Sequence, residues 1–239
     1  MHDHIDKFQS KLRQYFNEMI LGSAFVQLGR YVEHPEGIDI EVKLATDKTS
    51  EPTPLADLIH HAGGVGAGVT EFFQVRAIAA WNDLLTDLFG SFVHAHLNGQ
   101  KTFSSLKKRS ATIDFSSQEP IVVQLHRSIV RDYSFAPYDK RLSIIKELCE
   151  SSPSVVKDLK FVGKHVDIRN SLQHHGGVVT EEILKGLGSS KIELLDDQGE
   201  VIYSKLSDRI RLYIPELNLL KSALFRITIN WREALNADI

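Results

Sequence analysis

The residues most able to do chemistry form one short stretch, Arg169-Asn170-Ser171-Leu172-Gln173-His174-His175, which is followed by Gly176-Gly177. Arginine is a permanent cation whose planar fork of donors suits phosphate oxygens. Histidine takes or gives a proton near neutral pH. Cleavage of RNA by its own 2'-hydroxyl requires a base for that hydroxyl, an acid for the leaving oxygen and positive charge beside the phosphorane. The stretch therefore indicates metal-independent cleavage of RNA but not of DNA, which lacks the attacking hydroxyl.

The spacing within this stretch bears on how the groups could meet. At 3.6 residues per turn, Arg169 and His174 lie roughly 140° apart on one helix. If two copies of the chain pack this helix end against its mate, two arginines and two histidines line one cleft about a twofold axis. We therefore expect a homodimer with a shared site.

Arg169-Asn170-xxx-His174, near a helix end in a helical domain, resembles the motif of the HEPN superfamily (higher eukaryotes and prokaryotes nucleotide-binding). The resemblance is strongest over residues 155–183 and extends more loosely over 68–235. Many members of that superfamily are metal-independent endoribonucleases in toxin–antitoxin or defence systems, and many act as homodimers. Other members keep the fold and have lost the chemistry. The resemblance implies a HEPN-like helical bundle, RNA as substrate and an antitoxin or defence-system protein as a further partner.

The same resemblance gives roles to individual residues. Arg169 would stabilise phosphate charge, His174 would transfer protons, and Asn170 would orient the ring or hydrogen-bond a phosphate. His175 is either the working imidazole or a contact to the substrate. The residues expected to contact substrate are His175, Lys164, Lys107 and Lys108.

Composition sets wider bounds on the protein. The chain has 239 residues, of which 42% are hydrophobic, enough for a packed core. The single cysteine, Cys149, excludes an internal disulfide framework and fits a reducing compartment as a buried core thiol. The opening Met1-His2-Asp3-His4 is not the start of a signal peptide, and the chain has no apolar run of membrane length. We expect a cytoplasmic protein that does not enter a membrane.

Charge is distributed unevenly along the chain. The net charge is −3. Residues 101–175, however, hold thirteen Lys and Arg residues against eight Asp and Glu residues. These counts are compatible with a basic face that binds RNA on an otherwise acidic protein. They are equally compatible with a solvated surface on which both charges are mixed.

Hydrophobic spacing predicts a mainly α-helical protein with a small β-hairpin. Helices are expected over 5–31, 69–97, 121–131, 138–149, 153–175 and 215–235. Strands are expected over 38–44, in a hairpin within 191–204 around Asp196-Asp197-Gln198-Gly199, and over 210–214.

Glycine and proline mark the expected boundaries. Gly63 to Gly68 is predicted to be a flexible seam between an N-terminal segment, residues 1–62, and the HEPN-like domain, residues 63–239. Ser151-Ser152-Pro153 supplies capping hydroxyls and a first-turn proline for the helix that carries the motif. Gly176 is expected to end that helix.

Other chemistries have weaker signals. The paired histidines His60-His61, His94-x-His96 and His174-His175 lack the carboxylate or cysteine partners that define a metal site, so no metal or other cofactor is expected. Gly63 to Gly68 lacks the Gly-Lys-Ser/Thr of a phosphate-binding loop. Two alternatives to the nuclease stay open: a non-catalytic HEPN-like module that binds RNA, nucleotide or protein, and a metal-dependent hydrolase.

Overall fold

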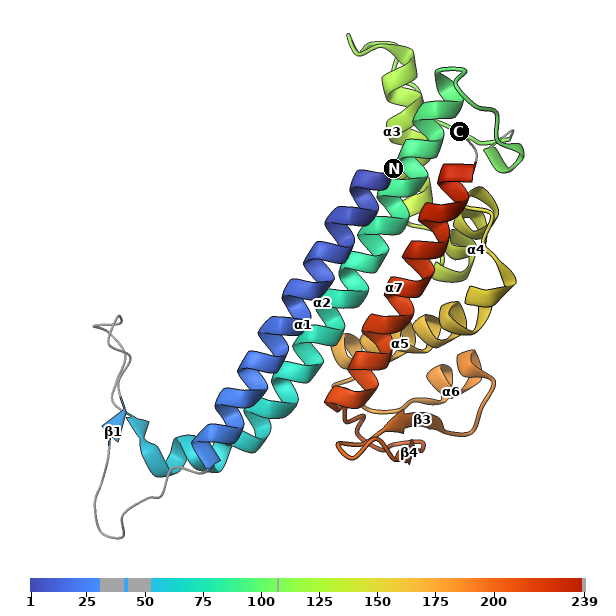
Figure 1. Cartoon of the computed structure of the whole chain (residues 1–239). Helices are drawn as coiled ribbons and strands as arrows, with labels where there is room; N and C mark the ends of the chain where they lie inside the picture. Colours follow the sequence, from blue (N-terminus) through green and yellow to red (C-terminus); the bar gives the residue numbers. More distant parts are fainter. Residues whose placement is uncertain (31–40, 43–52, 107, 238–239) are drawn as a thin grey trace. The chain divides into compact units, whose positions relative to one another are not determined.

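The structure is a computed structural model that describes residues 1–30, 41–42, 53–106 and 108–237. Within them the protein is mainly helical, as hydrophobic spacing predicts (Figure 1). The α-helices are α1 (His2–Arg30), α2 (Leu55–Leu97), α3 (Ile121–Ser134), α4 (Tyr138–Leu148), α5 (Val156–His174), α6 (Glu181–Leu187) and α7 (Ile214–Ala237). Short 3-10 turns cover Ser104–Leu106 and Pro153–Val155, and the strands are β1 (Glu41–Val42), β2 (Thr53–Pro54), β3 (Ile192–Leu195) and β4 (Val201–Ser204). No helix in these described ranges combines the length and apolarity needed to cross a membrane.

Contacts divide the chain into two compact units. The first, which we call the tryptophan unit, comprises residues 1–12, 77–163 and 221–239. The second, the motif unit, comprises residues 13–76 and 164–220 and holds the stretch from Arg169 to His175. The sequence-based division into residues 1–62 and 63–239 stays a prediction.

The core of the tryptophan unit is built on large aromatic side chains. Trp81 and Trp231 are fully buried and stacked, with ring centroids 5.2 Å apart. Each indole N–H has a partner, since Trp81 donates to the Tyr138 hydroxyl and Trp231 to the Ser151 hydroxyl. Such pairing removes the cost of burying the polar edge of a tryptophan. The unit therefore combines apolar burial with satisfied donors.

The motif unit begins with the antiparallel pair of α1 and α2. Phe16 of α1 meets Phe73 of α2 edge to face, with ring centroids 5.6 Å apart. Arg76 pairs with Glu18 at 2.6 Å and lies 3.8 Å from the centroid of the Tyr15 ring. These contacts fix α2 against α1 within the unit (Figure 1).

Helix α2 corrects the expectation of a break at Gly63 to Gly68, because it runs from Leu55 through these glycines to Leu97. Each glycine within a helix costs about 1 kcal/mol relative to alanine. A Cβ at Gly66 would make only an ordinary contact with Val26, at 3.5 Å, and one at Gly68 would meet nothing within 4 Å, so close packing does not explain these two glycines. On α1, a Cβ at Gly22 would lie 3.2 Å from Val69, so this glycine allows α2 to approach closely.

The hairpin of the motif unit is confirmed. Strands β3 and β4 pair antiparallel, with Ile192 opposite Ser204 and Leu195 opposite Val201. In the connecting turn the Asp196 carboxylate accepts from the backbone N–H groups of Gln198 and Glu200. Gly199 has a φ of +84°, which glycine adopts without strain.

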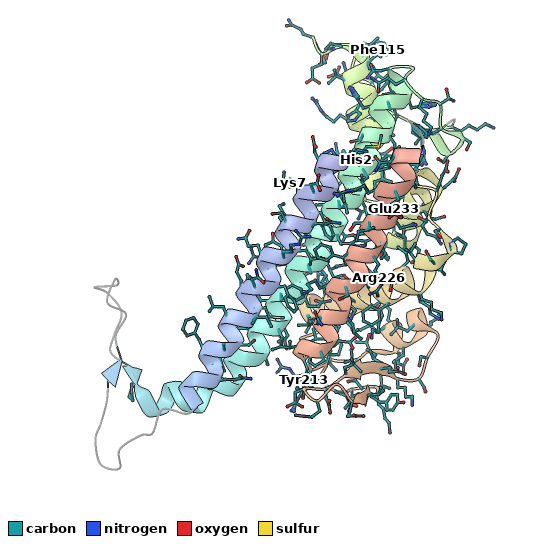
Figure 2. The ribbon with its side chains drawn as sticks, in the orientation of Figure 1. His2, Lys7, Phe115, Tyr213, Arg226 and Glu233 are labelled. Carbon is teal, nitrogen blue, oxygen red and sulfur yellow. The ribbon has the colours of Figure 1, made fainter. Side chains whose placement is uncertain are left out.

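The third strand expected over 210–214 is wrong. Ile210 and Leu212 are buried and Arg211 is exposed, so this segment has the alternation of a strand. It is not a strand, however: an isolated bridge between Arg209 and Val178 comes just before it, and α7 begins at Ile214, next to Tyr213 (Figure 2). Alternating burial therefore occurs here without a strand.

The motif helix begins and ends as predicted. Ser152 caps the turn Pro153–Val155 by accepting from the Ser154 N–H, and α5 follows from Val156. The helix ends at His174, and Gly176 and Gly177 both have positive φ values, +60° and +75°. Cys149 is buried, as expected, and burial raises the pKa of its thiol.

Candidate functional site

The candidate site is the C-terminal end of α5, where four motif side chains reach or approach the surface. His174 and His175 are exposed, whereas Arg169 and Asn170 are half-buried. The final turn of α5 therefore presents two imidazoles to solvent and holds the arginine and the amide closer to the protein. This arrangement offers both a proton carrier and a cation to an incoming anion.

Arg169 is held by its neighbour in the chain. Its Nη1 donates to the Asn170 Oδ1 across 3.2 Å. Its Nε is buried and has no hydrogen-bond partner among the described residues. The amide of Asn170 thus contacts the guanidinium through one hydrogen bond.

A buried serine fixes the turn that follows the motif. The carbonyl of Ser171 accepts from the N–H groups of His175 and Gly177, and its hydroxyl donates to the Val178 carbonyl across 2.7 Å. A Cβ at Gly177 would lie 3.1 Å from the Leu172 side chain, in addition to its unfavourable φ. These constraints set the backbone on which both histidines stand.

The turn is also tied to residues far along the chain. The Ile210 N–H donates to the Gly177 carbonyl, and the Val179 N–H donates to the Asp208 carbonyl. Val178 and Arg209 form an antiparallel bridge. Arg209 is exposed, and its backbone lies opposite the residue three positions after His175. Sequence reasoning did not find this additional cation near the motif, because only backbone pairing brings it there.

Beneath the motif, Glu216 at the start of α7 accepts from two residues of α5. Its Oε1 lies 2.6 Å from the Lys164 Nζ and 3.0 Å from the His165 Nε2. Its Oε2 accepts from the Leu195 N–H of β3 across 3.0 Å. The Glu216 side chain is 2% exposed and that of His165 is fully buried. We call Lys164, His165 and Glu216 the internal ion cluster, and it joins α5, β3 and α7 within the motif unit.

Burial and charge decide the ionisation of this cluster. Burial lowers the pKa of His165 and outweighs the opposing hydrogen bond from Glu216. Burial alone would raise the pKa of Glu216, but His165 and Lys164 together hold it below its usual value. An ionised carboxylate only accepts, so the neutral His165 must carry its proton on Nε2 and donate to Glu216. The cluster is therefore one buried ion pair with a neutral imidazole beside it.

Acidification is expected to destabilise the protein through His165. Its folded-state pKa is lowered from 6.5, so the unfolded state binds more protons once the pH falls through that value. Between pH 7 and pH 5 one such histidine removes at most about 2 kcal/mol of unfolding free energy. Urea unfolding of the wild type and of His165→Gln at both pH values measures this.

The variant keeps an amide that can donate to Glu216 in place of the imidazole. We expect its stability to change less between pH 7 and pH 5 than that of the wild type. Equal losses in the two proteins would show that His165 does not hold a neutral ring in the folded state.

The expected substrate contacts are divided between the two units. Lys164 donates to Glu216 and to the Glu193 carbonyl, so it has structural partners in the motif unit. Lys108 is exposed and belongs to the tryptophan unit, whereas Arg169 and the two histidines belong to the motif unit. Lys107 lies outside the described residues. Contact of these three lysines with a substrate stays a prediction.

The other histidine pairs bring no metal centre into the described part of the chain, where no three or more His, Cys, Asp or Glu side chains are placed to hold an ion. Nothing is described of the His60 and His61 side chains. His94 is hydrogen-bonded to Asn98, and His96 accepts from the Phe103 N–H.

No protein-family model matches the chain, and neither a curated protein nor a solved structure is significantly similar to it.

Proposed function

We propose that the protein is a metal-independent endoribonuclease of HEPN-like type whose site is the end of α5. The observation that carries the proposal is the joint placement of an oriented arginine and two exposed imidazoles on one helix end. Arg169 would bind the scissile phosphate, Asn170 would hold the guanidinium, and His174 would transfer protons. Lys164 pairs with Glu216 in the structure, and its contact with a substrate stays a prediction.

The proposed reaction needs no group from outside the protein and its substrate. The RNA 2'-oxygen forms a bond to phosphorus as its proton passes to an imidazole, and the bond from phosphorus to the 5'-oxygen breaks as that oxygen receives a proton. The negative charge on the non-bridging oxygens is highest in the phosphorane that forms between these two steps. A guanidinium in a fixed position stabilises that charge most. The products are a 2',3'-cyclic phosphate and a 5'-hydroxyl.

Two proton transfers and the angular separation of Arg169 from His174 favour a homodimer. One imidazole that accepts a proton and a second that donates one can act together if two copies bring their α5 ends to one cleft. His174 of each copy would then supply one of the two transfers. If the protein dimerised through another surface, each motif would lack the second His174. That outcome would favour RNA binding without cleavage.

The nature of the products tests the proposal. Purified protein incubated with RNA in excess chelator is expected to produce 2',3'-cyclic phosphate and 5'-hydroxyl ends, and to leave DNA intact. RNA with a single 2'-deoxy position at the cleaved linkage is the matched control, because it lacks only the attacking oxygen. Ends carrying a 5'-phosphate, or cleavage that appears only with added metal, would contradict the mechanism. Binding of RNA without cleavage would favour the non-catalytic HEPN-like module instead.

A further inference from the structure

A second site is indicated in the tryptophan unit, in a cavity of about 230 Å³ that is lined by residues 108–110 and by residues of α3 and α4. Three cationic side chains line it, Lys108, Arg109 and Lys140, with one carboxylate, Asp132. Ile129 and Ile144 form part of its wall. The cavity is therefore basic at one part of its lining and apolar at another.

The charges of this cavity are available to a ligand. In the ranges that the structure describes, no ion pair includes any of the four charged residues. This contrasts with Arg127 on α3, which binds Glu119 through both terminal nitrogens. Three cations and one carboxylate give the lining a net charge of about +2 near neutral pH, where lysine, arginine and aspartate are all ionised.

Arg109 is already oriented in the cavity. Its Nη2 donates to the Ser105 carbonyl across 2.9 Å, and its guanidinium carbon lies 5.7 Å from the Phe89 ring centroid. Phe89 in turn stacks on the buried Tyr133 with centroids 3.9 Å apart. A guanidinium held in this way loses less conformational entropy on binding an anion. The Tyr133 hydroxyl donates to the Arg141 carbonyl, and Tyr133 also forms part of the cavity lining.

We propose that this cavity binds a phosphomonoester whose organic part is small and flat or apolar. A phosphomonoester carries a charge of about −1.5 to −2 at pH 7, which matches the lining better than a phosphodiester or a carboxylate. The guanidinium and ammonium groups bind its oxygens, and Ile129, Ile144 and Tyr133 contact the organic group. The source of the phosphate is either a free small molecule or the 5'-phosphate end of an RNA. This inference does not depend on the proposed nuclease activity.

Isothermal titration calorimetry of the full chain with phenyl phosphate tests the proposal. Lys140→Ala is expected to weaken binding about fivefold, because it removes one exposed cation. Asp132→Asn is expected to tighten binding about threefold, because it removes the one carboxylate. Lys146→Ala is the matched control, since Lys146 is on the same helix, α4, but not in the cavity lining. Opposite effects of the two cavity variants cannot come from a general loss of folding.

Further ligands test which ligand charge the cavity prefers and where the phosphate group comes from. Phenyl sulfate has the same ring and one negative charge, and it is expected to bind at least fivefold more weakly than phenyl phosphate. RNA tetranucleotides with a 5'-phosphate or a 5'-hydroxyl show whether a polynucleotide end enters the cavity. Tighter binding of the phosphorylated RNA assigns the site to RNA ends, and equal binding assigns it to small molecules. The proposal is overturned if phenyl phosphate does not bind, or if Lys140→Ala and Asp132→Asn bind it as the wild type does.

Discussion

Replacing His174 with alanine is expected to lower the rate of RNA cleavage by about a hundredfold or more, the size of effect that a positioned proton-transfer group contributes. RNA affinity should change little, because the Arg169 guanidinium and not the imidazole is proposed to bind the phosphate. His174 is exposed at the end of α5, so the substitution removes no core contact. The measurements are the single-turnover cleavage rate and the RNA dissociation constant of variants with wild-type melting behaviour.

Gln173→Ala is the matched control for this prediction, because Gln173 is an exposed neighbour on the same turn. Arg169→Ala should lower both the rate and the affinity, since the guanidinium would bind phosphate before and during the reaction. If His175→Ala abolishes cleavage and His174→Ala does not, the two imidazoles have been assigned in the wrong order. If neither histidine affects cleavage, the catalytic interpretation fails and the RNA-binding alternative takes its place.

Replacing Glu216 with alanine is expected to lower the free energy of unfolding by about 3–5 kcal/mol, the range found when one partner of a buried ion pair is removed. Glu216 accepts from Lys164, His165 and the Leu195 N–H, and its side chain is 2% exposed. The variant would remove the carboxylate that balances the Lys164 charge and would leave the Leu195 N–H without this acceptor. Urea unfolding at pH 7 measures the loss.

Glu182→Gln is the control for Glu216, because Glu182 is an exposed glutamate of α6 in the same unit. Its replacement should change stability by less than about 0.5 kcal/mol. The double variant Glu216→Leu with Lys164→Met should recover much of the loss, because an apolar pair removes both buried charges together. A loss below about 1 kcal/mol for Glu216→Ala would contradict the structural role of the internal ion cluster.

Local signals predicted the end of the helix that carries the candidate site, since Gly176 indicated the helix end that the structure places after His174. The phosphate chemistry that the spacing of Arg169, Asn170 and His174 indicates stays a prediction. The spacing of residues in the sequence did not predict which group each side chain contacts. The hydrogen bond between Arg169 and Asn170 depends on side-chain rotamers. The bridge that brings Arg209 opposite Val178 depends on the path of the chain over thirty intervening residues.

By itself the sequence determined the mainly helical class, the start of the motif helix at Ser152-Pro153 and the turn at Gly199, because capping and turn preferences act over a few neighbouring residues. Only the tertiary structure decided that α2 runs through the glycines near Gly66 and that Glu216 accepts from His165, 51 residues earlier. Both outcomes come from contacts between segments distant in the sequence. Contacts between α1 and α2, such as that of Phe16 with Phe73, stabilise α2 although glycine has a low helix propensity. Burial lowers the pKa of His165 in the internal ion cluster, and neither effect leaves a periodic signal in the chain.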